Sequence, residues 1–258
     1  MSLSENGQVF SYDPPTVTGI FLHQACRFGD KTMSMAKKDG RWEAVTWRQA
    51  REMLPQAVMG LFALGFQKGD PVGIVSGTRR EWSGMDVAIL TAGGVTIGIY
   101  PSASLWEMTH IITHSGLKIC FAENDAMLER LLEVRSKTGR PEKIVLFETA
   151  RREFPDGVIL QDAFMEQGGR LHASDPDRFE AVWKAVRPSD LATIAYTSGT
   201  TGPPKGVMIT QANLYHTAIN ASRMHSYEES DFGIAFLPLT HMLQRMSIYA
   251  AMHLGIVG

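Results

Sequence analysis

The sequence is poor in cysteine and has no excess of charge of either sign. Only two cysteines, Cys26 and Cys120, occur in 258 residues, and neither stands in a CxxC or Cys/His spacing. This scarcity argues against a disulfide framework and against a zinc site, and it favours a reducing cytoplasm. Lysine and arginine total 25 and aspartate and glutamate total 27, which leaves a net charge of −2. Without a basic excess we expect no nucleic-acid partner.

Long hydrophobic runs and an export leader are missing too. The first residues, MSLSENGQVFSYDPP, contain neither the basic start nor the apolar centre of a signal peptide. The longest apolar stretch, residues 87–100, is interrupted by glycines and is too short to cross a bilayer. We therefore expect a cytoplasmic protein. Peripheral contact with a membrane and formation of a homodimer stay open, although no basic amphipathic helix in the sequence supports the membrane contact.

Short β-branched runs alternate with longer helix-patterned segments from residue 70 onward. Strands are predicted at 71–76, 95–100, 117–122 and 143–147, with helical patterns between them. Ser104 and Glu107 have the spacing of a capping box, which predicts that one of these helices starts directly after Ser104. The alternation is typical of βαβ units and predicts an α/β fold in which mostly parallel sheets are flanked by helices.

The pattern is irregular after residue 148 and then resumes. Helices are predicted at 160–167 and 175–184, strands at 191–197, 206–210 and 232–239, and further helices from 211 and from about 241. We divide the chain into an N-terminal segment (1–69), a first α/β lobe (70–185) and the start of a second α/β lobe (186–258). The last stretch, MSIYAAMHLGIVG, lacks the capping and charged residues expected after a helix end, so we expect a piece of a longer protein.

A loop rich in glycine and hydroxyl side chains, YTSGTTGPPKGV at 196–207, lies between two predicted strands. Loops of this composition present backbone N–H groups and hydroxyls to phosphate oxygens, and the three glycines allow a close approach. The Walker loop does not fit, because Lys205 follows Pro204 and leads into Gly206 and a strand instead of Ser or Thr and a helix. An ordinary turn is the plain alternative, since these residue types are common in turns.

The order of residues in this loop resembles the phosphate-binding motif of the adenylate-forming superfamily, which includes acyl-CoA synthetases, peptide-synthetase adenylation domains and firefly luciferase. Residues 65–125 are similar to the N-terminal region of long-chain acyl-CoA synthetases, and FLPLTHMLQR at 236–245 resembles the family motif LPLxHxxxR. The resemblance covers roughly residues 10–258. It implies a truncated N-terminal domain of an enzyme that joins a fatty acid to coenzyme A, using ATP and Mg²⁺ and releasing AMP and diphosphate through an acyl adenylate.

The resemblance also implies roles for individual residues. The residues implied to surround the β- and γ-phosphates are Thr197, Ser198, Gly199, Thr200, Thr201 and Gly202. Lys205 would add a positive charge nearby, and Thr197 would also help to hold Mg²⁺. His241 would lie beside the acyl carboxylate and the α-phosphate, with Arg245 facing the same site one helical turn later. The adenine- and ribose-binding residues and the C-terminal domain of the family would come after residue 258, so we expect this chain to be inactive alone.

Two other functions stay open. One is an adenylation enzyme for aryl or amino acids, although GIYPSASLWEMTHIITHSG and LPLTHMLQR are closer to fatty-acyl enzymes. The other is a non-catalytic module that binds a nucleotide or an acyl group. His110 and His114 have the spacing of a zinc pair, but Ile111 occupies the glutamate position of HExxH and no third ligand is evident. We expect these two histidines to form a solvated helix face.

Overall fold

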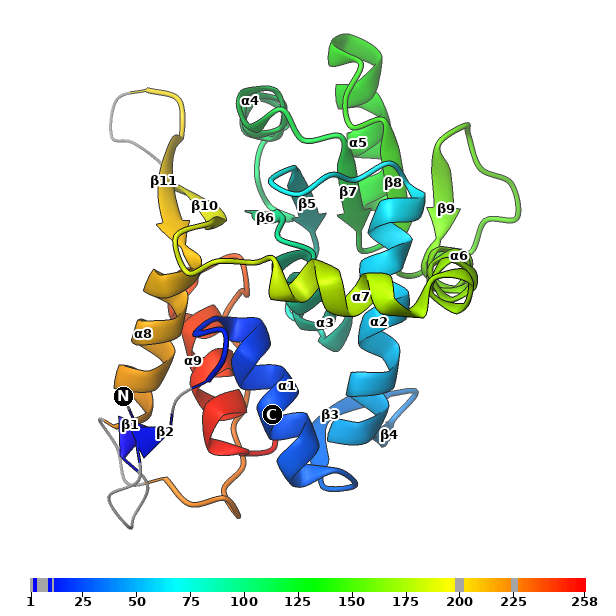
Figure 1. Ribbon diagram of the computed structural model, residues 1–258. Helices are drawn as coiled ribbons and strands as arrows, with labels where there is room; N and C mark the ends of the chain where they lie inside the picture. Colours follow the sequence, from blue (N-terminus) through cyan, green and yellow to red (C-terminus); the bar gives the residue numbers. More distant parts are fainter. Residues whose placement is uncertain (1, 4–8, 11, 198–201, 224–226) are drawn as a thin grey trace.

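The computed structural model describes residues 2–3, 9–10, 12–197, 202–223 and 227–258, and its centre is a seven-stranded sheet with the order β11-β10-β6-β5-β7-β8-β9 (Figure 1). The strands are β5 (Pro71–Val75), β6 (Val95–Ile99), β7 (Ile119–Ala122), β8 (Lys143–Leu146), β9 (Val158–Leu160), β10 (Leu191–Thr197) and β11 (Lys205–Thr210). All neighbouring strands pair in parallel except β10 and β11. The prediction of an α/β fold with a mostly parallel sheet is confirmed.

Helices cover both faces of this sheet. One layer consists of α4 (Leu105–Ser115) and α5 (Asp125–Thr138). The other face is covered by α1 (Val17–Phe28), α2 (Trp47–Ala63), α3 (Arg80–Thr91), α6 (Gln161–Ser174), α8 (Gln211–Ser222) and α9 (Met242–Leu254), while α7 (Pro176–Lys184) crosses the front in Figure 1. Each layer has its own buried apolar cluster, because successive side chains of a strand point to opposite faces.

Strand β6 shows this alternation and separates the two layers. Val95, Ile97 and Ile99 belong to the apolar cluster under α4 and α5. Thr96 points the other way, where its hydroxyl donates a hydrogen bond to Asp86 of α3, 2.7 Å away. Gly98 faces the same side and leaves room for Thr240. The face of β6 toward α3 therefore carries the small and polar residues that meet the segment before α9.

The sequence predicted no elements before residue 70, but the structure forms several there. Besides α1 and α2, a hairpin pairs β3 (Thr32–Lys38) with β4 (Arg41–Thr46), and two short strands, β1 (Ser2–Leu3) and β2 (Val9–Phe10), pair with each other. Helix α2 starts at a capping box in which Thr46 and Gln49 satisfy each other's backbone N–H groups.

Most predicted elements after residue 70 are confirmed. The capping box is present, since Ser104 Oγ accepts from the Glu107 N–H at 3.2 Å and Glu107 Oε2 accepts from the Ser104 N–H at 2.7 Å. Strands 191–197 and 206–210 form as predicted, and β10 pairs with β6 of the seven-stranded sheet in parallel, through Thr193 and Thr96. The division into three lobes stays a prediction.

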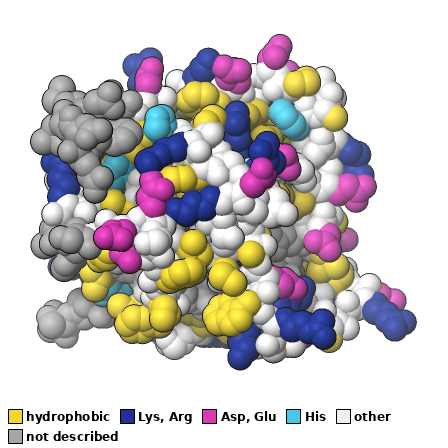
Figure 2. Space-filling view, turned by 90° about the horizontal axis from the view of Figure 1, so that it is seen from below, with side chains coloured by type: hydrophobic (Ala, Val, Ile, Leu, Met, Phe, Trp, Pro, Cys, Tyr) yellow, Lys and Arg dark blue, Asp and Glu magenta, His cyan; other side chains and the backbone are white. Residues whose placement is uncertain are grey.

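The predicted strand at 232–239 is wrong. Within the described residues its only backbone pairing is an isolated bridge from Phe232 to Val257. Phe232, Ile234 and Phe236 are 73%, 82% and 75% exposed. Their alternation satisfies the strand pattern, but a strand also needs backbone partners in register, and sequence periodicity does not show whether these exist. Hydrophobic side chains also gather along one margin of the face seen in Figure 2.

Every helix in the described ranges falls short of the length and apolarity that a bilayer crossing requires.

Candidate functional site

The carboxyl ends of the parallel strands meet at one edge of the sheet, where ligands bind in open α/β folds. Thr197 ends β10, Tyr100 follows β6 and Glu123 follows β7. Glu123 Oε2 accepts from the Gly77 N–H at 2.6 Å, which ties the turn after β5 to the end of β7. This edge brings the described residues of the two sequence motifs, 196–207 and 236–245, to opposite sides of β6, since the first motif contacts α4 and the second packs on the face toward α3.

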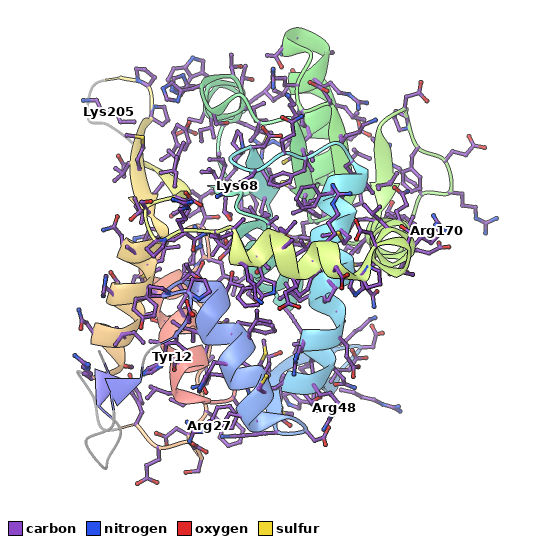
Figure 3. All side chains as sticks on the ribbon, in the orientation of Figure 1. Tyr12, Arg27, Arg48, Lys68, Arg170 and Lys205 are labelled. Carbon is purple, nitrogen blue, oxygen red and sulfur yellow. The ribbon has the colours of Figure 1, made fainter. Side chains whose placement is uncertain are left out.

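The first motif is carried by the β10–β11 hairpin. Thr197 is paired across the hairpin with Lys205, and both side chains are exposed, as is Gly202. Figure 3 shows Lys205 at the outer end of the hairpin. The loop joins two antiparallel strands, so the distinction from a Walker loop, which leads into a helix, is confirmed. Ser198, Gly199, Thr200 and Thr201 lie outside the described residues.

Gly206 is required by packing within the hairpin. A Cβ atom at this position would lie 2.6 Å from Cγ2 of Ile194 on the neighbouring strand. That separation is far shorter than a normal contact between carbon atoms, which is about 3.5–4.0 Å. The glycine therefore lets β11 close onto β10 immediately beyond Lys205.

Helix α4 supports the hairpin through two histidines. His110 Nε2 donates to the Pro204 carbonyl at 3.0 Å, and a hydrogen bond of 2.8 Å joins His114 Nδ1 and the Tyr196 hydroxyl. The His110 ring stacks between Trp106 at 6.0 Å and His114 at 5.4 Å. The expectation of a solvated face was wrong for His110, which is half-buried, because sequence spacing does not reveal the hairpin packed against α4.

A cavity of about 260 Å³ opens between α4 and the hairpin. Its lining consists of Tyr100, Ser102, Ala103, Glu107, Ile111, Tyr196 and Pro204. Hydrogen bonds from the backbone and the hydroxyl of Ser104 lower the pKa of Glu107, so this carboxylate is ionised near neutral pH. Burial raises the pKa of Tyr196, although the Ser115 hydroxyl opposes this, so the phenol stays neutral. A negative charge in the cavity disfavours a phosphate inside it.

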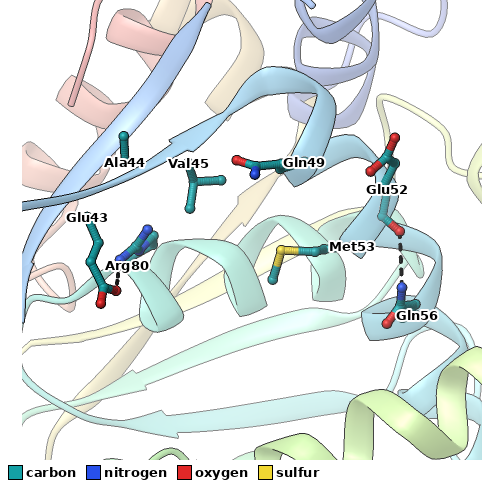
Figure 4. Close-up of a pocket in the computed structure, with 8 residues that line it drawn as sticks. All are labelled: Glu43, Ala44, Val45, Gln49, Glu52, Met53, Gln56 and Arg80. Atoms are coloured by element: carbon teal, nitrogen blue, oxygen red, sulfur yellow. Dashed lines mark hydrogen bonds and ion pairs between the residues drawn. The ribbon is translucent and has the colours of Figure 1, made fainter. Parts of the chain in front are cut away.

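A second hollow, of about 590 Å³, lies between the β3–β4 hairpin, α2 and the start of α3 (Figure 4). Glu43 and Arg80 form an ion pair at 3.8 Å across it, and Met53 also faces it. No described residue of the two sequence motifs lines this hollow.

The second motif lies on the α3 side of β6. The Thr78 hydroxyl donates to the Leu237 carbonyl at 2.6 Å, and Gln244 Oε1 accepts from the Leu237 N–H at 3.1 Å. A Cβ atom on Gly98 would approach Thr240 to 3.2 Å, so the chain before His241 packs directly on the strand. These contacts attach the residues before α9 to the sheet.

His241 is exposed and caps helix α9. Its Nδ1 atom accepts from the Leu243 N–H at 3.2 Å. Because Nδ1 is the acceptor, the proton of the neutral ring is on Nε2. The ring therefore has an N–H donor on the side away from the helix.

Arg245 does not face the same site as His241, contrary to the expectation. It is buried, and its guanidinium forms an ion pair with buried Asp86 of α3. Burial disfavours the charged form of Arg245, but the Asp86 carboxylate and Tyr249 outweigh this and raise the pKa of the guanidinium. A sequence signal for the pair existed: Asp86 is the only charged residue from 82 to 106, and Arg245 is the only one from 232 to 258.

The architecture and motifs of this site agree with comparisons to known proteins. A family model described as AMP-binding enzyme matches residues 21–257. The chain belongs to the AMP-binding enzyme family. The chain is 35% identical over 217 residues to the long-chain-fatty-acid–CoA ligase FadD15 of Mycobacterium bovis. This match covers 83% of the chain and 35% of that protein. It is 27% identical over 256 residues to the long-chain-fatty-acid–CoA ligase ACSBG2 of Xenopus laevis, covering 97% and 34%.

The chain spans about a third of the length of these curated relatives. A solved structure, the N-terminal domain of FACL13 from Mycobacterium tuberculosis, matches with a TM-score of 0.72 at 19% identity. That match covers 94% of this chain and 56% of the other, and it shows a shared fold.

Proposed function

We propose that this chain is the phosphate-holding part of an ATP-dependent acyl-CoA synthetase. The reaction joins a fatty acid to coenzyme A in two steps: the carboxylate displaces pyrophosphate from ATP to form an acyl adenylate, and the CoA thiol then displaces AMP. The observation that carries the proposal is the pairing of Thr197 with Lys205 at the carboxyl edge of the sheet. It brings both ends of the phosphate motif together on an exposed hairpin.

The phosphate motif supplies hydrogen-bond donors and one positive charge. We assign the β- and γ-phosphates to Thr197, Ser198, Gly199, Thr200, Thr201 and Gly202. The ammonium of Lys205, exposed opposite Thr197, would meet the charge that develops on the departing pyrophosphate. Because the ionised Glu107 would repel phosphates, we place them at the exposed end of the hairpin and not in the cavity beside α4.

A magnesium ion fits this arrangement if ATP brings most of its ligands. In the described residues no three His, Cys, Asp or Glu side chains gather as a metal-ligand set. The Thr197 hydroxyl is an exposed oxygen donor of the kind Mg²⁺ accepts, alongside phosphate oxygens and water. Bound Mg²⁺ would neutralise part of the phosphate charge.

His241 is the proposed catalytic residue on the other side of β6. The hydrogen bond from the Leu243 N–H to Nδ1 leaves the ring proton on Nε2. This Nε2–H can donate to an oxygen of the acyl carboxylate or the α-phosphate. Donation to an oxygen that gains charge in the transition state lowers the barrier, whereas a group that binds the ground state equally well does not.

For the acid we propose a medium- or long-chain fatty acid, because relatives with up to 35% identity are named long-chain-fatty-acid–CoA ligases. An aryl- or amino-acid-activating enzyme is the second candidate. We also propose a cytoplasmic location. Contact with a membrane surface and formation of a homodimer stay open.

Pyrophosphate exchange on the longer enzyme, of which we propose this chain is the N-terminal part, tests the function. With fatty acids of graded length we expect exchange that falls at least about 100-fold in Lys205→Ala. Lys118→Ala, which removes an exposed lysine elsewhere, is the matched control and should leave exchange unchanged. Exchange only with aryl or amino acids would establish the second candidate, and no exchange with any acid would reject both.

A further inference from the structure

The polar cluster around Asp86 and Arg245 is buried between α3, α9, β6 and β10. Arg245 Nε donates to Asp86 Oδ2 at 2.8 Å, and Nη2 bonds the other carboxylate oxygen, so the pair is bidentate. Nη1 donates to the Thr193 hydroxyl at 2.8 Å, and that hydroxyl donates to the Thr96 carbonyl at 2.6 Å. One guanidinium thus links two helices to the two strands at the centre of the site.

Further side-chain contacts close the cluster. The Tyr249 hydroxyl donates to Asp86 Oδ2, and the Thr96 hydroxyl donates to Asp86 Oδ1 at 2.7 Å. The Arg245 guanidinium also lies over the Trp82 ring, 5.4 Å from its centroid. Every oxygen of the carboxylate is bonded, which is the condition under which a buried charge is tolerated.

Stability alone does not account for such a pair. Two charges lose their hydration on burial, and replacing a buried ion pair by apolar residues of similar volume is often neutral or stabilising. A pair with fixed bidentate geometry does restrict how two elements can sit against each other. In this fold it restricts the start of α9 relative to α3 and the sheet.

The restriction matters for the proposed reaction because it acts on the first turn of α9. Arg245 lies one turn after His241, whose ring is fixed by a hydrogen bond to the helix backbone. Gln244, next to Arg245, holds the Leu237 N–H, and Leu237 is also held by Thr78. Moving the start of α9 would therefore move the His241 ring and the chain before it together.

We propose that the Asp86–Arg245 pair is a positioning device: it fixes the start of α9 so that His241 holds one ring orientation at the carboxyl edge of the sheet. The consequence for catalysis rests on the proposed function, but the positioning itself does not. Asp86 and Arg245 act through His241 and contact no substrate.

Nitrogen-15 NMR of the histidine side chains of this chain tests the positioning without any assay of activity. In the wild type, His241 should show one protonated and one unprotonated ring nitrogen; loss of its signals in His241→Asn assigns them. In Asp86→Leu/Arg245→Met, the fold should persist while the His241 signals shift and broaden, because the start of α9, together with the ring bonded to it, no longer holds one position against the sheet. Ile89→Ala, which removes buried apolar volume from α3, is the control for loosened packing and should leave them unchanged.

Arg245→Lys serves if the double variant does not fold, because it keeps the charge and loses the bidentate contact. Unchanged His241 signals in whichever variant folds would overturn the proposal, and so would an equal shift and broadening in Ile89→Ala. In the longer enzyme the same variant should lower kcat/KM for exchange about 10- to 100-fold, as expected for a reacting group misplaced by about 1 Å. Shifted and broadened signals with unchanged exchange would support the positioning and reject the role of His241 in the proposed function.

Discussion

The two motifs on either side of β6 are supported in different ways. The phosphate motif is on a hairpin at the sheet edge, where α4 contacts it through His110 and His114 at a partly exposed surface. The second motif contains Arg245 of the buried ion pair, and Tyr12 holds the other end of α9 through a 2.6 Å hydrogen bond to His253. Surface hydrogen bonds are individually weak, whereas a buried charge is costly to leave unpaired.

This difference suggests a division of labour. In the proposed reaction the hairpin must bind and release a polyphosphate, which favours weak contacts between the hairpin and α4. His241 needs one fixed orientation, which favours strong buried contacts at the start of α9. Variants on each side should show a rigid buried side and a weakly held hairpin.

Removing one member of the buried pair should have the largest effect. Asp86→Ala leaves the Arg245 charge buried without its carboxylate, and we expect a loss of about 3–5 kcal/mol in the free energy of unfolding. Urea denaturation of this chain, followed by circular dichroism, measures it. Glu133→Ala, which removes an exposed ion pair with Lys137, should lose less than about 1 kcal/mol. Similar losses in the two variants would remove the contrast between buried and exposed supports.

The fold was predictable from sequence wherever local signals coincide with tertiary contacts. Ser104 and Glu107 set the start of α4 by local hydrogen bonds, and the buried strands carry continuous apolar runs. Phe232, Ile234 and Phe236 show the limit, because their alternation is a strand pattern without strand partners among the described residues. Strand pairing depends on backbone partners that are far away in the sequence, so a short stretch of sequence does not reveal them.

Acid should destabilise the buried side through His253. Burial, together with the charges of Arg223 and Arg27 and the nearby His23, lowers the pKa of His253 from its ordinary 6.5 to about 4. The folded chain holds the ring neutral, with Nδ1 as the partner of the Tyr12 hydroxyl, while the unfolded chain takes up a proton below pH 6.5. Stability should therefore be full above pH 6.5 and fall by roughly 3 kcal/mol between pH 6.5 and 4.

Thermal melting between pH 7 and 4 measures this fall. His253→Gln, which offers Tyr12 an oxygen acceptor and does not titrate, should flatten the curve in that window. His216→Gln, at an exposed position on α8, is the matched control and should leave the curve as in the wild type. An equally steep fall in His253→Gln would show that other groups cause it.

The hairpin side should show the smallest effect. His110→Phe keeps a ring to stack on Trp106 but removes the donor to the Pro204 carbonyl, so we expect a loss of only about 1 kcal/mol. Hydrogen exchange of the β10 and β11 amides should accelerate while exchange in β5 and β7 stays unchanged. A loss as large as that of Asp86→Ala would mean that the hairpin is not weakly held.

The candidate site was only partly predictable. The loop composition and the resemblance predict Thr197, Lys205 and His241 as site residues, and these roles stay predictions; the structure places the first two opposite each other. The expected location of Arg245 was wrong, because one helical turn of separation does not ensure a shared site, and the side chain turns into the core. Its partner Asp86 is 159 residues away in sequence. The two isolated charges in apolar segments were nevertheless a visible sign of a buried pair.

Binding of MgATP to this chain, measured by titration calorimetry, tests most directly whether the hairpin holds phosphates. We expect binding that weakens about 10- to 100-fold in Lys205→Ala, the equivalent of about 1.5–3 kcal/mol for a charged hydrogen bond. Lys118→Ala should bind as tightly as the wild type. Equal affinity of wild type and Lys205→Ala would contradict the assignment of the phosphate site to this hairpin.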